Sequence, residues 1–229
     1  MSYIDSTKLK KSKTGIKFEI LGLKKKTIGV LTSAGGVGKG YLLKSFFTDT
    51  KNFLFKRPLK IAYFSLEDDI DIVNDKFSEM DIVHKNIHFY FNKTEFFNLV
   101  PNKYDLIIVD TFSRFNKGQV DENSNSEMSY LYDTILDRVR ELNCALLFIH
   151  HTNKTSRDKK NGSFDANSLR GAGSLSDDAR LVIGLEEVKK GVLKASTLKI
   201  NFESPNSQVY NRNASGGLEI VKEQGRNKC

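Results

Sequence analysis

Features that mark a secreted or membrane-bound chain are scarce in this sequence of 229 residues. It has two cysteines, Cys144 inside an apolar run and Cys229 at the last position, which excludes a disulfide framework and the cysteine spacing of a zinc site. No apolar run approaches the roughly 18 residues that a membrane span needs. The first residues also lack the apolar core of a signal peptide. We therefore expect a cytoplasmic protein that does not contact membranes.

Basic residues outnumber acidic residues, 36 to 28. The formal net charge is +8, and 39% of residues are hydrophobic against 28% charged, which is typical of a globular chain. A basic balance favours an anionic partner such as nucleic acid, although a lysine-rich composition shared by a whole proteome would produce the same charge. The length is enough for one α/β domain with a large core.

Apolar spacing predicts an α/β fold with a mostly parallel central sheet. Consecutive apolar residues predict strands over residues 27–33, 59–67, 86–91, 104–110 and 144–151. Helical spacing predicts helices over residues 39–50, 68–80 and 126–143. Strands of this kind suit a parallel sheet that helices cover on both faces. Late antiparallel strands are expected over residues 181–188, 196–203 and 216–222, the first two joined by a hairpin.

The chain divides into two parts of unequal size. Residues 1–26 are polar and lysine-rich apart from a short apolar patch, and we expect them to form a basic arm. This arm either packs on a neighbouring subunit or is a frayed terminus. We expect residues 27–229 to form one domain.

A glycine-rich stretch, TSAGGVGKGYL, follows the first predicted strand and opens the first predicted helix. Glycines at such a turn let backbone N–H groups converge on phosphate oxygens, and the helix N-terminus adds positive partial charge. Lys39 supplies a point charge for the β- and γ-phosphates, while Ser33 stands where a phosphate loop usually has its first glycine. The stretch predicts a nucleotide site made of Gly35, Gly36, Val37, Gly38, Lys39, Gly40 and Tyr41.

The position after the loop lysine is unusual. A phosphate loop has Ser or Thr there, whose hydroxyl is one of about six oxygens around Mg²⁺. This chain has Gly40 instead. A water molecule can take the place of the hydroxyl, but the metal is then held less firmly, so we expect hydrolysis to be reduced or absent.

Acidic and imidazole side chains stand at the ends of three later strands. Glu67 follows the second strand, where it can orient and deprotonate an attacking water. Asp110 ends the apolar run YDLIIVD, the form of an acid that holds Mg²⁺ directly or through water. His150 and His151 end the fifth strand. Adjacent strand residues point to opposite faces, so we expect one histidine to face the nucleotide and packing or a nearby loop to satisfy the other.

A long polar segment follows the histidines. Such segments in compact domains are usually functional or disordered. Basic side chains on a mobile loop can grip a nucleic-acid backbone without reading its sequence, although a solvated surface loop is an equally simple explanation. The candidate DNA-binding residues are Lys154, Arg157, Lys159 and Lys160.

The order of these motifs resembles that of RecA-type ATPases, and among them the RepA-like replicative helicases of plasmids and phages. The resemblance spans roughly residues 27–222. It rests on SAGGVGKG, SLEDD, YDLIIVDTFSRF, LFIHHTNK and LRGAGSLSDDARLVIGL, of which the last two are the most specific. It implies a RecA-like P-loop core that binds ATP and Mg²⁺. It further implies a homohexameric ring with ATP at subunit boundaries, single-stranded DNA in the channel, and a replication initiator or primase as a possible partner.

The resemblance also assigns roles. Lys39 would bind phosphates, Glu67 would be the catalytic base, Asp110 the magnesium acid and His151 the γ-phosphate sensor. Residues that would act on a neighbouring subunit's nucleotide, or lie near the boundary, are Lys199, Arg212, Arg170 and Arg180.

The function that the resemblance implies is an ATP-driven, ring-forming DNA helicase or translocase that serves replication of a plasmid, phage or other mobile element. Two other functions remain open. Gly40 favours a nucleotide-binding assembly protein that holds a complex together on DNA with weak or absent turnover. A RecA-like signalling or recombination ATPase is the third alternative, and filaments rather than rings would favour recombination.

Overall fold

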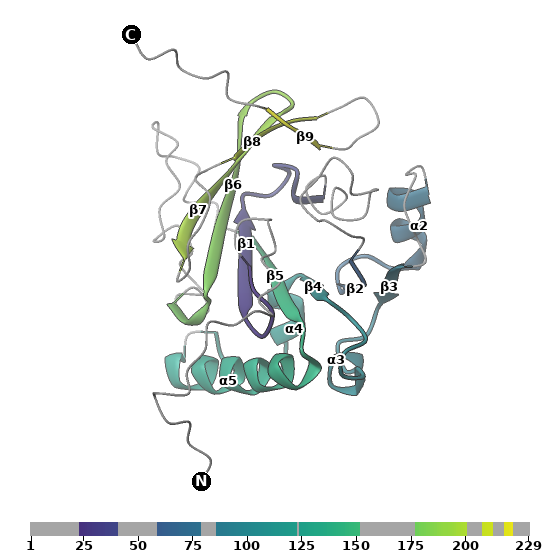
Figure 1. Cartoon of the computed structure of the whole chain (residues 1–229), viewed down its shortest axis with the longest axis vertical. Helices are drawn as coiled ribbons and strands as arrows, with labels where there is room; N and C mark the ends of the chain where they lie inside the picture. The colour runs from purple at the N-terminus through teal and green to yellow at the C-terminus, as the bar shows by residue number, and fades with distance from the viewer. Residues whose placement is uncertain are drawn as a thin grey trace, which may run out of the picture.

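In the computed structural model, the described residues are 23–40, 59–78, 86–122, 124–151, 177–200, 208–212 and 218–221. Within this part, one sheet has the strand order β3-β2-β4-β5-β1-β6-β7-β8-β9 (Figure 1). The strands are β1 (Ile28–Ser33), β2 (Ile61–Ser65), β3 (Ile87–Tyr90), β4 (Leu106–Asp110), β5 (Ala145–His151), β6 (Leu181–Lys189), β7 (Val192–Ile200), β8 (Gln208–Arg212) and β9 (Leu218–Ile220). The helices are α2 (Ile70–Ser78), α3 (Glu95–Asn98), α4 (Phe112–Asn116) and α5 (Asn125–Leu142).

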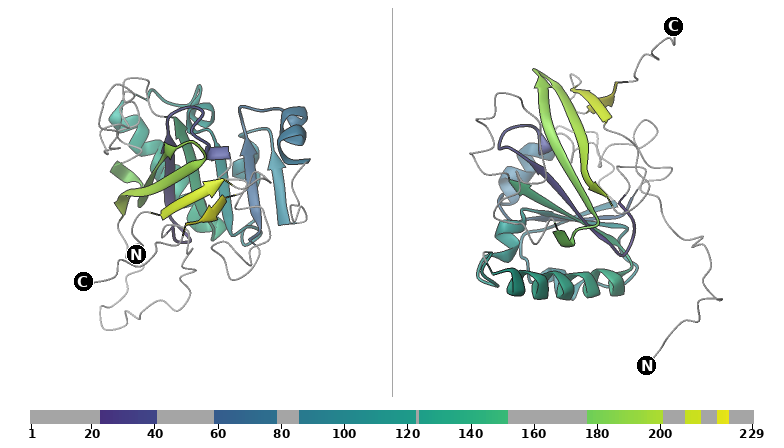
Figure 2. Two further views of the ribbon diagram at one scale, coloured as in Figure 1. Left: turned by 90° about the horizontal axis from the view of Figure 1, so that it is seen from above. Right: turned by 90° about the vertical axis from the view of Figure 1, so that its left-hand side faces the viewer.

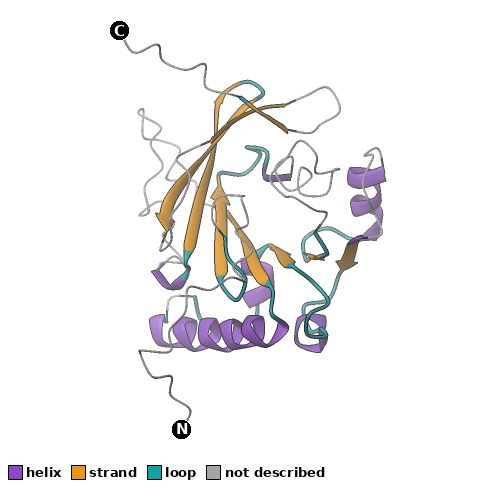
Figure 3. Ribbon diagram, in the orientation of Figure 1, coloured by secondary structure: helices purple, strands orange, loops and turns teal. Residues whose placement is uncertain are grey.

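The sheet has a parallel and an antiparallel half. Every neighbouring pair from β3 to β6 is parallel, and the pairs β6–β7, β7–β8 and β8–β9 are antiparallel. This arrangement confirms the predicted mostly parallel α/β sheet with late antiparallel strands. Helix α5 lies across one end of the molecule, and β8 and β9 lie at the opposite end (Figures 2 and 3).

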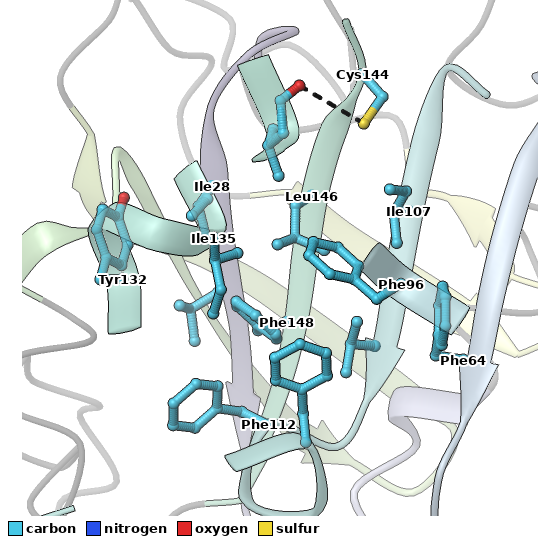
Figure 4. Close-up of a cluster of buried hydrophobic side chains, with 14 of the residues drawn as sticks. Ile28, Phe64, Phe96, Ile107, Phe112, Tyr132, Ile135, Cys144, Leu146 and Phe148 are labelled. Atoms are coloured by element: carbon cyan, nitrogen blue, oxygen red, sulfur yellow. Dashed lines mark hydrogen bonds between the residues drawn. The ribbon is translucent and has the colours of Figure 1, made fainter. Parts of the chain in front are cut away.

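Alternate residues of the parallel strands supply two separate cores. On the first face, α2 contributes Val73 and Phe77, which pack with odd-numbered residues of β1, β2 and β5. On the second face, α3, α4 and α5 cover the even-numbered residues of β1, β2 and β5, with Phe64 and Phe148 fully buried (Figure 4). Both faces are apolar because both are covered, which explains the uninterrupted apolar runs of these strands.

Helix α5 follows the predicted helix closely, because its sequence carries both end signals. Ser124 is its N-cap, and the Ser124 hydroxyl accepts a hydrogen bond from the Glu127 N–H at 3.4 Å. Asn143 ends it in the left-handed conformation, with φ of 55°. Between the ends, one stripe of side chains is buried: Met128, Leu131, Tyr132, Ile135, Val139 and Leu142.

The predictions missed three elements, α3, α4 and β8. Helices α3 and α4 have four and five residues, too few to show a helical period. Strand β7 begins at Val192 rather than at residue 196, and β8 was not predicted. The strand pairing of β7 with β6 and β8 stabilises these segments through backbone hydrogen bonds that apolar spacing does not report. The predicted helix at 39–50 begins at Lys39, and its residues after Gly40 lie outside the described part.

The last residues of the predicted arm belong to the packed structure. Leu23 is buried in the core of the first face. Lys25 forms a 3.3 Å ion pair with Asp105, and the Lys26 N–H donates to the Cys144 carbonyl. Residues 1–22 lie outside the described part, so the arm itself stays a prediction.

Candidate nucleotide-binding site

The carboxyl ends of the central parallel strands meet at one edge of the sheet. Strand pairing places Ser33 beside His151, and Asp110 beside both Ile149 and Ser65. In open α/β sheets, ligands bind in the crevice outside this edge. Strand register therefore brings together residues that are more than a hundred positions apart in the chain.

The glycine-rich loop leaves β1 and turns sharply before a helix begins at Lys39. Gly36 and Gly38 have φ of 78° and 113°, conformations that side-chain-bearing residues rarely adopt. Such a turn brings backbone N–H groups to one side, as a phosphate cradle requires. The loop conformation thus fits the predicted nucleotide site.

The Lys39 side chain is held under the loop. Its ammonium donates to the Ser33 hydroxyl at 2.7 Å and to the Ser33 carbonyl at 3.3 Å, and Nζ lies 3.0 Å from His151 Nδ1. Only 8% of the residue is exposed. Burial lowers the pKa of Lys39 to about 8, although the negative charges of Asp110 and Glu67 act in the opposite direction.

Asp110 ends β4, and its carboxylate accepts a hydrogen bond from a side chain of the neighbouring strand β2. The Tyr63 hydroxyl donates to Asp110 Oδ2 at 2.6 Å. Burial raises the pKa of Asp110 above its ordinary value, and the Tyr63 hydrogen bond opposes that shift. Burial is also the main reason that the pKa of Tyr63 is well above its ordinary value, so Tyr63 keeps its proton and acts as the donor.

Glu67 lies between a buried hydroxyl and His151. The Thr111 hydroxyl donates to Glu67 Oε1 at 2.8 Å and lies 3.1 Å from the Ser113 hydroxyl. Glu67 Oε2 lies 3.7 Å from His151 Nε2. His151 therefore touches Lys39 with one ring nitrogen and faces Glu67 with the other.

The two adjacent histidines have different surroundings. His150 follows the even-numbered residues of β5 to the second face, beside Thr32 of β1. Burial lowers the pKa of His150 to about 4, with smaller contributions from His151 and Lys39. The residue is half-buried, its Nδ1 is enclosed, and in the described part of the chain neither this atom nor the Thr32 hydroxyl has a hydrogen-bond partner.

The donor set fits a magnesium ion that is shared with phosphates. Among the described residues, no group of three or more His, Cys, Asp and Glu could hold a metal by itself. Mg²⁺ usually takes one or two carboxylates together with waters and substrate phosphates, and Asp110 lies beside the loop to serve in this way. Gly40 contributes no side-chain oxygen, and a Cβ at this position would meet no described atom within 4 Å.

The remaining predicted residues are described only in part. Lys199 of β7 donates to the Asp177 carbonyl of its own chain, and the backbone N–H of Arg180 donates to the Ile28 carbonyl. Arg212 belongs to β8, and its side chain is not described. Outside the described part lie Tyr41, Lys154, Arg157, Lys159, Lys160 and Arg170.

Sequence reasoning missed Tyr63 and Thr111, which bind the two acids. Tyr63 lies within an apolar strand run and looks like an ordinary core residue. The only available signal for Thr111 is its position after Asp110 at the strand end. The roles of both depend on strand register, which the sequence does not state.

Comparison with known proteins agrees with this geometry. A protein-family model described as an AAA domain matches residues 95–157, from α3 to just beyond β5. No curated protein sequence matches the chain.

Solved structures resemble this one over most of its length. The ATPase domain of a protein named G40P (not a substitution) has a TM-score of 0.66 at 11% identity, with 86% of each chain covered. A DnaB-like replicative helicase, studied with its primase interactions, has 0.66 at 12% identity, over 88% of this chain and 60% of that one. A KaiC-like protein from Pyrococcus horikoshii has 0.59 at 13% identity, over 88% and 92%. At these identities the likeness establishes the fold.

In the described part of the chain, no helix is long and apolar enough to cross a membrane.

Proposed function

We propose that this chain, whose fold is that of the RecA-type P-loop ATPases, is an ATP-driven DNA helicase or translocase of the RepA-like kind. The observation that carries the proposal is the meeting of four side chains at one sheet edge. Lys39 Nζ lies 3.0 Å from His151 Nδ1, and His151 Nε2 lies 3.7 Å from Glu67 Oε2. Asp110 completes the group, since its charge acts on Lys39.

Each of these residues has a part in the proposed reaction. Lys39, whose ammonium lies under the loop, would bind the β- and γ-phosphates in place of its present contacts with Ser33. Asp110 would hold Mg²⁺ directly or through water. The metal, when bound, would neutralise charge on the β- and γ-oxygens.

Proton transfer would fall to Glu67. Its carboxylate is half-exposed at the sheet edge, where it can accept a proton from an attacking water. The Thr111 hydroxyl would keep this carboxylate in place. His151 lies between Lys39 and Glu67, which suits a side chain that responds to the γ-phosphate and reports its loss.

The proposal also includes DNA binding, ring formation and a biological role. Support for DNA comes from the net charge of +8 and from the resemblance to a DnaB-like replicative helicase. We propose single-stranded DNA as the partner, a hexameric ring as the assembly, and replication of a plasmid, phage or other mobile element as the role. A primase or initiator would be a further partner.

A second function is favoured by one observation. Gly40 places no hydroxyl at the metal position. A protein that binds ATP tightly but hydrolyses it slowly would serve as a clamp that holds an assembly on DNA.

Steady-state ATP hydrolysis, measured with Mg²⁺ and with or without single-stranded DNA, separates the two functions. The motor predicts turnover that DNA stimulates and that Lys39→Ala abolishes, together with unwinding of a forked duplex. Glu67→Gln is the matched control, because it should keep nucleotide binding and lose turnover. Binding without turnover in the unaltered protein would favour the clamp, and absence of nucleotide binding would contradict both.

A further inference from the structure

Tyr63 is a buried tyrosine whose hydroxyl is directed at the proposed metal acid. Its Oη donates to Asp110 Oδ2 at 2.6 Å, and only 4% of the residue is exposed. Burying a hydroxyl costs free energy unless it is hydrogen-bonded. The apolar residues that occupy most positions on this face would avoid that cost, so the hydroxyl needs an explanation beyond packing.

Aromatic neighbours hold the Tyr63 ring in place. Phe89 of β3 lies 5.5 Å from it between ring centroids, and Phe77 of α2 lies 6.1 Å away in an edge-to-face contact. Phe77 and Phe89 also contact each other at 5.3 Å. The hydroxyl is thus fixed from two other elements, and Phe at this position would keep the same packing.

The geometry of the strands directs this hydroxyl to the carboxylate. Ser65 pairs with Asp110, and Tyr63 lies two residues earlier in β2, on the same face of the sheet. A long side chain can reach a diagonal neighbour at this separation. Asp110 therefore receives an oriented donor from an adjacent strand.

The missing hydroxyl in the phosphate loop makes the Tyr63–Asp110 hydrogen bond more important for metal binding. With Gly40 in place of a hydroxyl residue, Asp110 is the side chain that the motifs match to the metal. Donors that orient a metal-binding carboxylate commonly affect metal affinity by about 10–100-fold. An oriented Asp110 would offset part of what the missing hydroxyl removes.

We propose that Tyr63 is a positioning residue that orients Asp110 for the metal of the metal–nucleotide complex. This inference rests on the proposed function, since it needs a nucleotide site at this edge. It concerns metal affinity and not the binding of the nucleotide itself.

Tyr63→Phe tests the inference, because it removes the hydroxyl and keeps the ring. Mn²⁺ binding is measured in the presence of a non-hydrolysable ATP analogue, by the loss of the electron paramagnetic resonance signal of the free ion. The Mn²⁺ affinity should fall about tenfold in Tyr63→Phe. Affinity for the analogue in EDTA should stay within twofold of the unaltered protein. The matched control is Tyr132→Phe, which removes a hydroxyl that donates to the Asp178 carbonyl on the other face, at 2.7 Å. It should leave both affinities unchanged.

Three outcomes would overturn the inference while leaving the proposed nucleotide site in place. One is Mn²⁺ affinity of Tyr63→Phe within twofold of the unaltered protein. Another is an equal loss of analogue binding in EDTA, which would indicate a general structural role. The third concerns 3-fluorotyrosine at position 63, which retains the hydroxyl and should restore Mn²⁺ affinity; failure to do so would assign the effect to ring packing. If the unaltered protein binds no Mn²⁺–analogue complex, the proposed nucleotide site itself is wrong, and the role of Tyr63 with it.

Discussion

A single buried ammonium group lies at the centre of the proposed site. Lys39 loses hydration by burial, and in return it gains Ser33 oxygens, His151 and the charges of two acids. Desolvation is the larger effect, so the charged form is less favoured than in water. Phosphate oxygens would reverse this balance, because they bring negative charge to the ammonium.

Nucleotide affinity should therefore depend on pH. The pKa of Lys39 is about 8, so above that pH the free protein has lost the charge that phosphate binding requires. We expect the Kd for a fluorescent ATP analogue to rise by up to about tenfold per pH unit above pH 8 and to be flat between pH 7 and 7.5. Titrations from pH 7 to 9.5 measure this. Lys39→Arg, which stays charged, should remove the dependence; the same slope in both proteins would contradict the assignment.

Gly40 is the other residue with a measurable consequence. A side chain at this position meets no described atom within 4 Å, so we expect Gly40→Ser to fold normally and to supply the missing hydroxyl. We expect a lower Mg²⁺ concentration for half-maximal hydrolysis and a turnover increase of about tenfold, by analogy with other donors around a bound metal.

Gly40→Ala is the control for this substitution. Both variants add a Cβ to a helical position and should stabilise the helix by about 0.5–1 kcal/mol. Only the serine variant should change the Mg²⁺ dependence. An equal change in both would show that backbone stiffness, and not the hydroxyl, is responsible.

Strand β5 illustrates how one element serves both faces of the sheet. Its last two residues, His150 and His151, point in opposite directions. His151 reaches Lys39, and the half-buried His150 lies beside Thr32 with an enclosed Nδ1 that has no hydrogen-bond partner among the described residues. Burial lowers the pKa of His150 to about 4, so this histidine is neutral near pH 7.

His150 should make the protein less stable in acid. Its pKa of about 4 in the folded chain lies below the ordinary 6.5, so between these values the unfolded chain binds the additional proton. The stabilisation is present above pH 6.5 and is lost as the pH falls towards 4, by up to about 3 kcal/mol. Urea unfolding of the unaltered protein and of His150→Gln from pH 7 to 4 measures it. The variant should lose less stability over this range; parallel curves would contradict the prediction.

At the scale of the whole molecule, the Glu67 and His151 side chains of the proposed site are 37% and 44% exposed. Of the residues proposed to act on a neighbour's nucleotide or to lie near the boundary, Lys199 and Arg180 have described side chains. Lys199 contacts the Asp177 carbonyl of its own chain. A ring with ATP at subunit boundaries would complete each site with a residue from the next subunit.

Mixing subunits tests this assembly. An equal amount of Lys39→Ala protein is exchanged into the unaltered protein before ATP is added. The DNA-stimulated turnover per unaltered subunit should then fall to well below half of its value in the unmixed protein. The reason is that a ring in which subunits act in turn is stopped by one inactive member. Steady-state hydrolysis across mixing ratios measures it, and analytical ultracentrifugation gives the ring size. A linear fall in activity would indicate independent subunits.

Local patterns in the chain were sufficient for much of the fold. Five apolar runs predicted β1 to β5, and the helical spacing of the segment 126–143 predicted α5. The residues that define these elements are neighbours in sequence. The elements α3, α4 and β8 were not predictable in this way, because their sequences show no clear apolar period and contacts with distant segments stabilise them.

The features of the proposed site also divide into those that consecutive residues show and those that depend on the fold. The glycine turn, Lys39 and an acid at a strand end could be recognised in the sequence, since each depends on a few consecutive residues. The Tyr63–Asp110 and Thr111–Glu67 hydrogen bonds could not, because each joins residues 44 or more positions apart. Strand register and packing, which involve the whole chain, bring these partners within 3 Å. Local composition therefore specified which groups are present, and the folded sheet specified which of them meet.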